Sequence, residues 1–348
     1  MSAAAVAAHE GVLPASPRIL VVRLRRLGDL LLSTPTLRAV RLAYPLARLD
    51  VLVSAGFGDV LRGNPHADTV MRLPRGVAGF RRVLWTCRRT RYDAVLDLQS
   101  SARSAPLVLL SGAPVRVGWR KRWTRDWVYN RLVPGWDDPV YLARNMLRMA
   151  AAIGIPSPPD LSLALALTAA DREHAAALFK GASIDPSRPV CALSVVAKVA
   201  RKAWPLERYA ELADWLSAEC GVQVVLTSGP GELQQVEAVV GRMRARPQLW
   251  NYGPTSVHGL GAIYERCQLW IGNDGGPKHV ATAVGCPTVV ILKPGDERFW
   301  TDCFEDSRQL AVRPLSGEPA DSPAAITLDE VKDAVRAALA SAVHIGYP

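Results

Sequence analysis

The sequence predicts an α/β protein made of two doubly wound, Rossmann-like domains that face each other across a cleft. The chain has 348 residues, about twice the length of a usual domain. Apolar runs of strand-like length alternate with helical patterns in both halves, which is typical of parallel sheets covered on both faces. Each half also has a strand that turns sharply into a helix, at residues 24–29 and 272–279. Such a turn exposes unpaired N–H groups and a partial positive charge, so it suits an anion, and one in each half suits an enzyme that joins two substrates.

The first domain is predicted over residues 17–155, after a flexible N-terminal tail at 1–16. Periodicity predicts strands at 19–24, 49–53, 69–73, 94–98 and 115–118, with helices at 30–43, 57–63, 77–90, 102–110 and 141–153. The Trp- and Arg-rich stretch 119–134 has no clear period, and we expect it to be a substrate loop.

The second domain is predicted over residues 169–326, after a linker at 156–168 that begins with a Pro-rich cluster. Strands are expected at 190–193, 222–226, 248–250, 269–271 and 288–292, with helices at 171–180, 206–219, 232–244, 259–267 and 278–284. The C-terminal segment 327–348 contains a last helix, which we expect to pack back on the first domain. In both sheets the ligand is expected at the carboxyl ends of the strands.

Composition indicates a soluble, cytoplasmic protein. Residues 1–16 lack the basic start of a signal peptide, and the longest apolar stretch, 161–170, is too short to span a bilayer. No two cysteines form a CxxC pair, so we expect neither disulfides nor a zinc site.

Charge is distributed unevenly along the chain. Lys and Arg outnumber Asp and Glu by 24 to 10 in residues 1–150, whereas the numbers are 18 and 22 in residues 151–348. The first half therefore suits an anionic partner: nucleic acid, an anionic membrane surface, or a phosphorylated or carboxylated substrate. Alternatively, each basic cluster is only a solvated Arg-rich face.

Several short motifs follow one another in a recognisable order. They are residues 19–24 and 28–35 with 44–45 and 63–65, then 92–99 and 115–118, and finally 202–205 with Tyr209 and Leu212, and 272–274 with His279. Together, from about residue 18 to 300, they resemble glycosyltransferase family 9, the lipopolysaccharide heptosyltransferases. The segments 225–230 and 297–300 are most similar to the heptosyltransferase III branch.

The resemblance implies an inverting, metal-independent glycosyltransferase of the GT-B type with no cofactor besides its co-substrate. The second domain would bind the nucleotide sugar, expected to be ADP-heptose. The first domain would bind an inner-core lipopolysaccharide precursor with acidic sugars and phosphates, in peripheral contact with the anionic inner membrane. Nucleic acid is not expected as a partner.

Other functions remain open on the sequence. A relative could use another nucleotide sugar or acceptor, or could be a non-catalytic protein that binds an anion, RNA or a membrane. A nicotinamide-dependent oxidoreductase is disfavoured because the first turn lacks the G-x-G-x-x-G pattern. A sugar-nucleotide epimerase of the same fold needs only the nucleotide sugar, so the basic first half would have no anionic partner to bind.

Asp29 is the predicted catalytic base. Inverting transfer needs one group to take the proton of the acceptor hydroxyl, and the resemblance assigns this role to the carboxylate at this position. The alternative is that Asp29 only caps a helix beginning at Leu30.

The donor diphosphate is expected at the second turn, on Asp274, Gly275, Gly276, Lys278 and His279. Glycines permit close backbone approach, and the helix start supplies N–H donors. The family usually has Ser or Thr at the position of Gly275 and a small or apolar residue at that of Lys278. We therefore hypothesise that Lys278 compensates by contacting phosphate. Without the motif, His279 would be read as an ordinary helix histidine.

The resemblance adds Lys202 and Glu232 to the donor-binding residues, and Lys198, which stands where relatives often carry a hydroxyl residue, is assigned with them. Lys202 matches a lysine that contacts the donor phosphates, although it could be a surface lysine. Glu232 could hold sugar hydroxyls or only stabilise the first turn of its helix.

Acceptor binding is assigned to arginines of the first domain: Arg25, Arg26, Arg120 and Arg122. No metal-binding residues are predicted.

Overall fold

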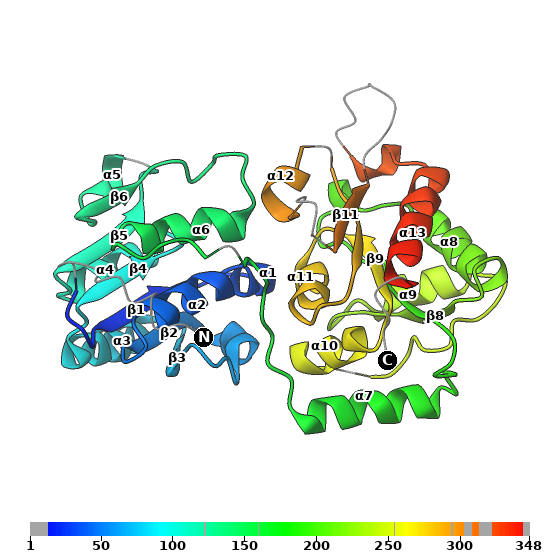
Figure 1. Cartoon of the computed structure of the whole chain (residues 1–348), viewed down its shortest axis with the longest axis horizontal. Coiled ribbons are helices and arrows are strands. Elements are labelled where there is room, and N and C mark those ends of the chain that lie inside the picture. The colour runs from blue at the N-terminus through cyan, green and yellow to red at the C-terminus, as the bar shows by residue number, and fades with distance from the viewer. Residues whose placement is uncertain are drawn as a thin grey trace, which may run out of the picture. The chain divides into compact units, whose positions relative to one another are not determined.

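The computed structural model describes residues 13–121, 123–158, 160–253, 255–293, 295–302, 308–312 and 322–343. The chain divides into two compact units, residues 1–164 and 165–348, each built on one sheet with helices around it (Figure 1). The two units are described in turn.

The first unit contains a six-stranded parallel sheet in the order β3-β2-β1-β4-β5-β6. The strands are β1 (Arg18–Val22), β2 (Arg48–Ser54), β3 (Thr69–Leu73), β4 (Ala94–Asp97), β5 (Val115–Trp119) and β6 (Arg131–Val133). The helices are α1 (Leu27–Leu31), α2 (Thr34–Ala43), η1 (Ala55–Leu61), α3 (Val77–Thr90), α4 (Ala105–Leu110), α5 (Trp123–Asp126) and α6 (Leu142–Ala151). The strand order reverses between β1 and β4, which is the point where open α/β sheets bind ligands.

The second unit contains a five-stranded parallel sheet in the order β11-β10-β9-β7-β8. The strands are β7 (Val190–Ser194), β8 (Gln223–Leu226), β9 (Leu269–Asn273), β10 (Thr288–Ile291) and β11 (Gln309–Val312). The helices are α7 (Ala169–Gly181), η2 (Ala200–Lys202), α8 (Leu206–Ala218), α9 (Leu233–Val240), α10 (Val257–Glu265), α11 (Gly276–Ala283), α12 (Glu297–Trp300), η3 (Pro323–Ala325) and α13 (Leu328–Val343). Here the strand order reverses between β7 and β9.

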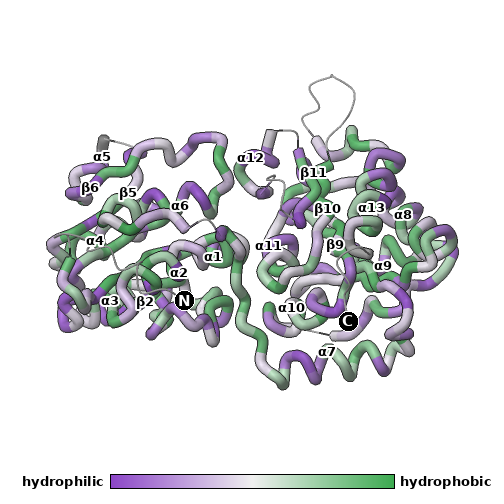
Figure 2. Tube along the Cα trace, in the orientation of Figure 1, coloured by the Kyte–Doolittle hydropathy of each residue, from purple (hydrophilic) through white to green (hydrophobic). Residues whose placement is uncertain are grey.

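The cores are formed by the strands β1, β2, β4, β7, β8, β9 and β10, whose Val, Ile and Leu side chains are almost fully buried on both faces. Burial of one such side chain contributes about 1.5–3 kcal/mol. The outer helices are amphipathic: in α7, Ala175 and Phe179 are buried, and Figure 2 shows hydrophilic and hydrophobic stretches alternating along this helix. The alternation of strand and helix read from the sequence is therefore confirmed as an α/β fold with two parallel sheets.

Several elements differ from their predicted form. The helix expected at 30–43 is divided into α1 and α2, because Pro35 starts a new helix and the Ser33 and Thr34 hydroxyls bond to carbonyls of α1. The stretch 119–134, predicted as a loop, contains α5 and the edge strand β6. The strand expected at 248–250 is a single bridge between Leu249 and Val225. The short elements α12 and β11 have no counterpart among the predictions.

The C-terminal helix α13 packs on the second unit, where the sequence led us to expect a return to the first. Its buried residues Val331 and Val335 join the core of β9, β10 and α8. The apolar stripe of α13 matches the face that this sheet leaves for one more helix.

Two further observations concern the described part of the chain. None of its helices combines the length and the apolarity that a bilayer crossing requires. The five cysteines within the described residues have free thiols: Cys87, Cys191, Cys220, Cys267 and Cys286.

Candidate active site

Asp29 lies in the first turn of α1, directly after the carboxyl end of β1. Its carboxylate is 2.9 Å from the guanidinium of Arg23, and its side chain is 14% exposed. Arg23 is buried, and its other terminal nitrogen donates to the Leu98 carbonyl at 2.7 Å. Because α1 begins at Leu27, ahead of Asp29, the carboxylate does not occupy the capping position that the alternative reading required. The ion pair with a buried arginine orients it instead.

The turn after β4 is joined to the turn after β1 through Gln99. Its side-chain oxygen accepts the N–H of Leu24 at 2.9 Å. Below it, the buried Asp97 accepts the N–H groups of Gln99 and Ser100, at 3.1 and 2.8 Å, and the hydroxyl of Tyr129 at 2.8 Å. Burial raises the pKa of the Asp97 carboxyl, although these hydrogen bonds oppose the rise. These hydrogen bonds hold the turns after β1 and β4 together at the point where the strand order reverses, and we call this hydrogen-bonded pair of turns the platform.

Lys121 completes this platform, and the sequence analysis did not single it out. Its ammonium donates to the Gln99 carbonyl at 2.8 Å and lies 4.5 Å from the centre of the Trp136 ring. Burial, and then the positive charge of Arg23, lower the pKa of Lys121 to about 8. No sequence pattern distinguishes Lys121 from its basic neighbours, because the contact with Gln99 exists only in the folded sheet.

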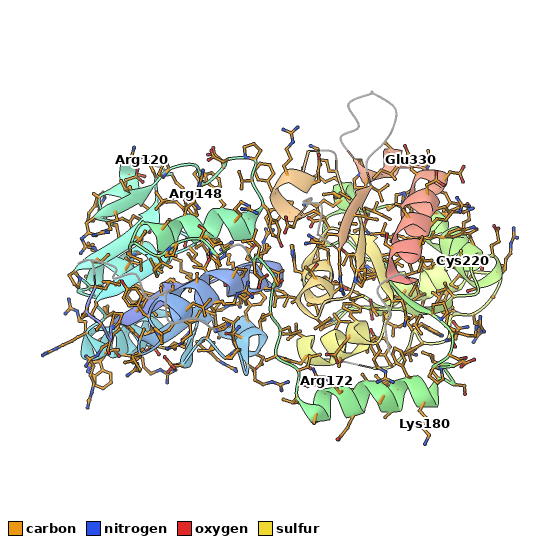
Figure 3. All side chains as sticks on the ribbon, viewed as in Figure 1. Arg120, Arg148, Arg172, Lys180, Cys220 and Glu330 are labelled. Carbon is orange, nitrogen blue, oxygen red and sulfur yellow. The ribbon has the colours of Figure 1, made fainter. Side chains whose placement is uncertain are left out.

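The arginines predicted to bind the acceptor lie at the surface of the first unit. Arg25 and Arg26 are exposed just before α1. Arg120, the neighbour of Lys121 in the chain, is also exposed and is labelled at the edge of the first unit in Figure 3. Arg122 lies outside the described residues. The structure therefore brings Asp29 together with Arg23 and Lys121, and leaves the described candidate arginines facing solvent.

The second predicted turn joins β9 to α11 through Asp274 and Gly275. The oxygen Oδ2 of Asp274 is 3.2 Å from the ammonium of Lys202, at the end of η2. Lys202 follows β7 and Asp274 follows β9, so the pair lies at the reversal point of the second sheet. The N–H groups that open α11, beginning at Gly276, lie at the same turn.

Lys202 has a second carboxylate neighbour, which the sequence analysis missed. Asp296, just before α12, is 3.4 Å from its ammonium, and the ring of Trp300 lies 6.0 Å away. These residues come from the segment 295–300, far along the chain from Lys202. In the sequence, only the likeness of residues 297–300 to one branch of the family pointed to this region, and it did not include Asp296.

Lys278 and His279 of α11 are both buried. The Lys278 ammonium donates to the backbone carbonyl of Trp300, so it connects α11 with α12. His279 packs edge-on against Trp300, with the ring centres 6.5 Å apart. Burial, and the neighbouring charge of Lys278, hold the pKa of His279 well below its usual value, so the imidazole is neutral.

Glu232 lies at the start of α9, after the carboxyl end of β8. Its carboxylate accepts the N–H of Gly229 at 2.7 Å. Beside it is a cavity of about 310 Å³, whose lining includes Ser228, Leu233, Trp250 and Tyr252. The third lysine predicted to bind the donor, Lys198, is exposed in the segment between β7 and η2. Glu232, Lys202 and Asp274 therefore follow three adjacent strands, β8, β7 and β9.

The described residues contain no group of three or more His, Cys, Asp or Glu side chains placed to hold a metal ion.

Comparison with known proteins gives the family. Residues 80–317 match the sequence profile of glycosyltransferase family 9 (heptosyltransferase). Lipopolysaccharide heptosyltransferase 3 of Escherichia coli is 26% identical over 292 residues, covering 78% of this chain and 82% of its own length. Lipopolysaccharide heptosyltransferase 2 of Salmonella typhimurium is 27% identical over 314 residues, covering 85% of this chain and 88% of its own length.

A solved structure agrees over nearly the whole chain. The E. coli ADP-heptose lipopolysaccharide heptosyltransferase II has a TM-score of 0.77 and 25% identity, covering 93% of this chain and 99% of that one. Its likeness, the family profile and the two parallel-sheet units agree on the fold and on the class of enzyme. The chain therefore belongs to glycosyltransferase family 9, the heptosyltransferases, and is a glycosyltransferase with the GT-B fold.

Proposed function

We propose that this chain is an inverting heptosyltransferase that moves heptose from ADP-heptose to a hydroxyl of an inner-core lipopolysaccharide acceptor. The pairing of Lys202 with Asp274 at the start of α11 carries the proposal, because it places a cation beside a helix N-terminus at a strand-order reversal. Relatives that are lipopolysaccharide heptosyltransferases 2 and 3, and a structural neighbour that uses ADP-heptose, support the substrate class.

The donor is proposed to lie along the carboxyl ends of three adjacent strands. Its diphosphate would bind the N–H groups of Gly275 and Gly276 and the ammonium of Lys202, because the N–H of Asp274 is bonded to the Ile291 carbonyl. Glu232 would accept hydrogen bonds from hydroxyls of the ribose or heptose. The cavity lined by Trp250 and Tyr252 would bind the adenine of the donor. The exposed Lys198 would contribute long-range attraction for the phosphates.

In the transfer step, Asp29 would take the proton of the acceptor hydroxyl as the oxygen attacks the anomeric carbon. The bond between that carbon and the phosphate oxygen breaks, its electrons leave with ADP, and the configuration inverts. Lys202 and the helix N–H groups would stabilise the negative charge that grows on the departing diphosphate. The step balances without a metal ion, and chelator-treated protein is expected to keep its activity.

Lys278 is proposed to serve the donor site by positioning α12. Its ammonium is bonded to the Trp300 carbonyl, and the Trp300 ring lies beside both Lys202 and His279. Lys278→Met would therefore raise the KM for ADP-heptose. An unchanged KM would exclude both this role and a direct contact with phosphate.

Contact with an anionic membrane surface is proposed for the outer face of α3, which would keep the protein peripheral at the cytoplasmic side of the inner membrane. This face exposes a Trp among arginines: Arg81, Arg82, Trp85, Arg88 and Arg89. The Arg89 guanidinium lies 5.2 Å from the Trp85 ring, and residues 69–92 contain no acidic residue. An interfacial tryptophan with cationic neighbours suits anionic headgroups.

Sedimentation with lipid vesicles tests this contact. The protein is expected to bind vesicles that contain phosphatidylglycerol but not pure phosphatidylcholine, and less strongly at high salt. Arg88→Glu with Arg89→Glu should abolish the binding, whereas Lys180→Glu on α7 should not. Equal binding by both variants would exclude α3 as the contact.

The enzymatic proposal is tested by incubating the protein with ADP-heptose and measuring ADP release. Release that requires a heptose-containing core acceptor supports the transferase. Release with another nucleotide sugar only would reassign the donor. No release with any donor, together with binding of the acceptor or vesicles, would indicate a non-catalytic relative.

A further inference from the structure

Lys121 differs from the other basic residues of the first unit in where its charge is held. It follows β5, and its ammonium reaches the Gln99 carbonyl at 2.8 Å. Gln99 in turn binds the backbone of Leu24, in the turn that leads to Asp29. The ammonium is thereby fixed at the reversal point of the sheet, although the adjacent Arg120 faces solvent.

In the described part of the chain, this cation has no counter-ion of its own. Among the described residues no carboxylate lies within ion-pair distance of the Lys121 ammonium. Asp29 is paired with Arg23, and Asp97 is occupied by Tyr129 and two backbone N–H groups. An ammonium has three N–H donors, and the Gln99 carbonyl uses one of them.

Trp136 supports the charge without neutralising it. The Lys121 ammonium lies 4.5 Å from the ring centre, a distance at which the ring attracts a cation. The tryptophan is 45% exposed, so part of its ring faces outward from the loop between β6 and α6. A cation with spare donors beside an exposed aromatic ring suits a sugar that carries an acidic group.

We propose that Lys121 and Trp136 form a subsite, beside Asp29, that binds a carboxylate or phosphate carried by the acceptor. This inference rests on the proposed function, and it makes Lys121 the residue of the first unit that selects acidic acceptors. The anion would supply a counter-charge that the described residues do not provide at this point. It would also hold the sugar next to the carboxylate that takes the proton.

The charges around Lys121 give the subsite a pH dependence. Burial and the positive charges of Arg23 and Arg125 lower its pKa to about 8, while Asp97 and Asp29 oppose this. A bound anion favours the protonated amine, so binding at pH 8 should take up protons. Acceptor affinity should therefore fall as the pH rises above 8.

Steady-state kinetics on matched variants test the subsite. Lys121→Gln should raise the acceptor KM about ten- to a hundredfold, as expected for loss of a charged hydrogen bond, and leave the KM for ADP-heptose unchanged. Arg75→Gln, which removes an exposed cation elsewhere on the first unit, should change neither. Lys121→Arg keeps the charge, so it should retain most of the affinity but lose the pH dependence above 8. An unchanged acceptor KM in Lys121→Gln, or an equal rise in both KM values, overturns the proposal.

Acceptors with one acidic group removed identify the anion. Two modified acceptors are compared, one dephosphorylated and one with its carboxyl group reduced. Wild-type protein should bind one of them, the one that lacks the recognised group, less well than the intact acceptor. With the acceptor that lacks the recognised group, Lys121→Gln should cause no further loss. Further loss with both modified acceptors would mean that Lys121 binds neither group.

A chemical probe separates failure of the subsite from failure of the proposed function. Pyridoxal 5′-phosphate followed by borohydride forms a secondary amine on accessible lysines, and peptide mass spectrometry locates it without any transfer reaction. Lys121 should be labelled in preference to the exposed Lys198 at pH 8, and the core acceptor should protect it. Equal labelling of the two lysines, or no protection, counts against the subsite even if the enzyme is active.

Discussion

At the scale of single residues, the site depends on charges that are held in place by buried partners. Arg23 illustrates this: it is buried, is anchored on the Leu98 carbonyl and presents its remaining terminal nitrogen to Asp29. A base that must meet a hydroxyl gains from such preorganisation, because a misplaced carboxylate loses much of its effect. The exposed arginines around it have no comparable anchor.

Asp29→Asn removes the proposed base and keeps its shape. General-base catalysis contributes about 10²–10⁴-fold, so kcat should fall by that order while the KM for ADP-heptose stays within about twofold. Steady-state measurement of ADP release checks this. Asp59→Asn is the matched control, since Asp59 is an exposed partner of Arg72 on the same unit. A kcat for Asp29→Asn close to wild type would remove Asp29 from the mechanism.

His279 should make stability depend on pH. Its pKa is lowered in the folded state by burial and Lys278, so below the unfolded value of about 6.5 the unfolded chain binds a proton that the folded chain does not. The contribution of His279 to the unfolding free energy is complete above the unfolded pKa of about 6.5 and is lost as the pH falls below it. Between pH 7.5 and 5.5 this loss amounts to about 1.4 kcal/mol of unfolding free energy. Urea unfolding should show a smaller loss in His279→Gln, and equal losses would contradict the assignment.

At the scale of elements, both sheets place the turns proposed for function where the strand order reverses. In the first, the turns after β1 and β4 are joined by Gln99; in the second, Lys202 after β7 meets Asp274 after β9. Parallel strands bring their carboxyl ends to one edge, so residues distant in sequence meet there. The position of the turns follows from the alternation of elements, and their contacts follow from the sheet order.

Gly272 shows how closely β7 and β9 approach. A Cβ at this position would lie 2.6 Å from the Ser194 carbonyl oxygen, which is backbone and cannot rotate away. Gly272→Ala should therefore lower the unfolding free energy by about 1–3 kcal/mol, the usual cost of overpacking. Thermal unfolding measures the effect, with Gly181→Ala as control because nothing lies near its Cβ. If the two variants unfold at the same temperature, the strands have room that the structure does not indicate.

At the scale of the whole molecule, the proposed functions are divided between two units of different charge. The basic first half contains Asp29, Lys121 and α3, whereas the residues proposed for the donor belong to the second. Each unit has its own sheet and its own core, so binding of the donor and proton transfer can be changed separately.

This division predicts how ADP affects unfolding. At a concentration of 100 times its Kd, ADP should stabilise the protein by about 2.7 kcal/mol. Asp29→Asn should keep this stabilisation, and Lys202→Met should lose most of it. Lys198→Met, at an exposed lysine of the same segment, should keep most of it. Calorimetric unfolding with and without ADP distinguishes the variants, and equal losses at the two lysines would contradict the role of Lys202.

The sequence alone determined the class of fold, most strands and helices, the position of both candidate turns and the family. These depend on local periodicity and on short motifs, which a single chain displays directly. It also singled out Asp29, Lys202, Asp274 and Glu232, because each directly follows a strand or lies in a motif. It missed the division of α1 from α2, and it did not foresee β6 within the stretch 119–134.

The tertiary structure decided which charges meet. Lys121 reaches Gln99, Lys202 lies near Asp296 and Trp300, and α13 completes the core of the second unit. None of these contacts follows from spacing along the chain, because each depends on which strands are neighbours and on how deeply a side chain is buried. A basic residue in the sequence is one among many, and burial beside a particular carbonyl or carboxylate is what gives it a particular role.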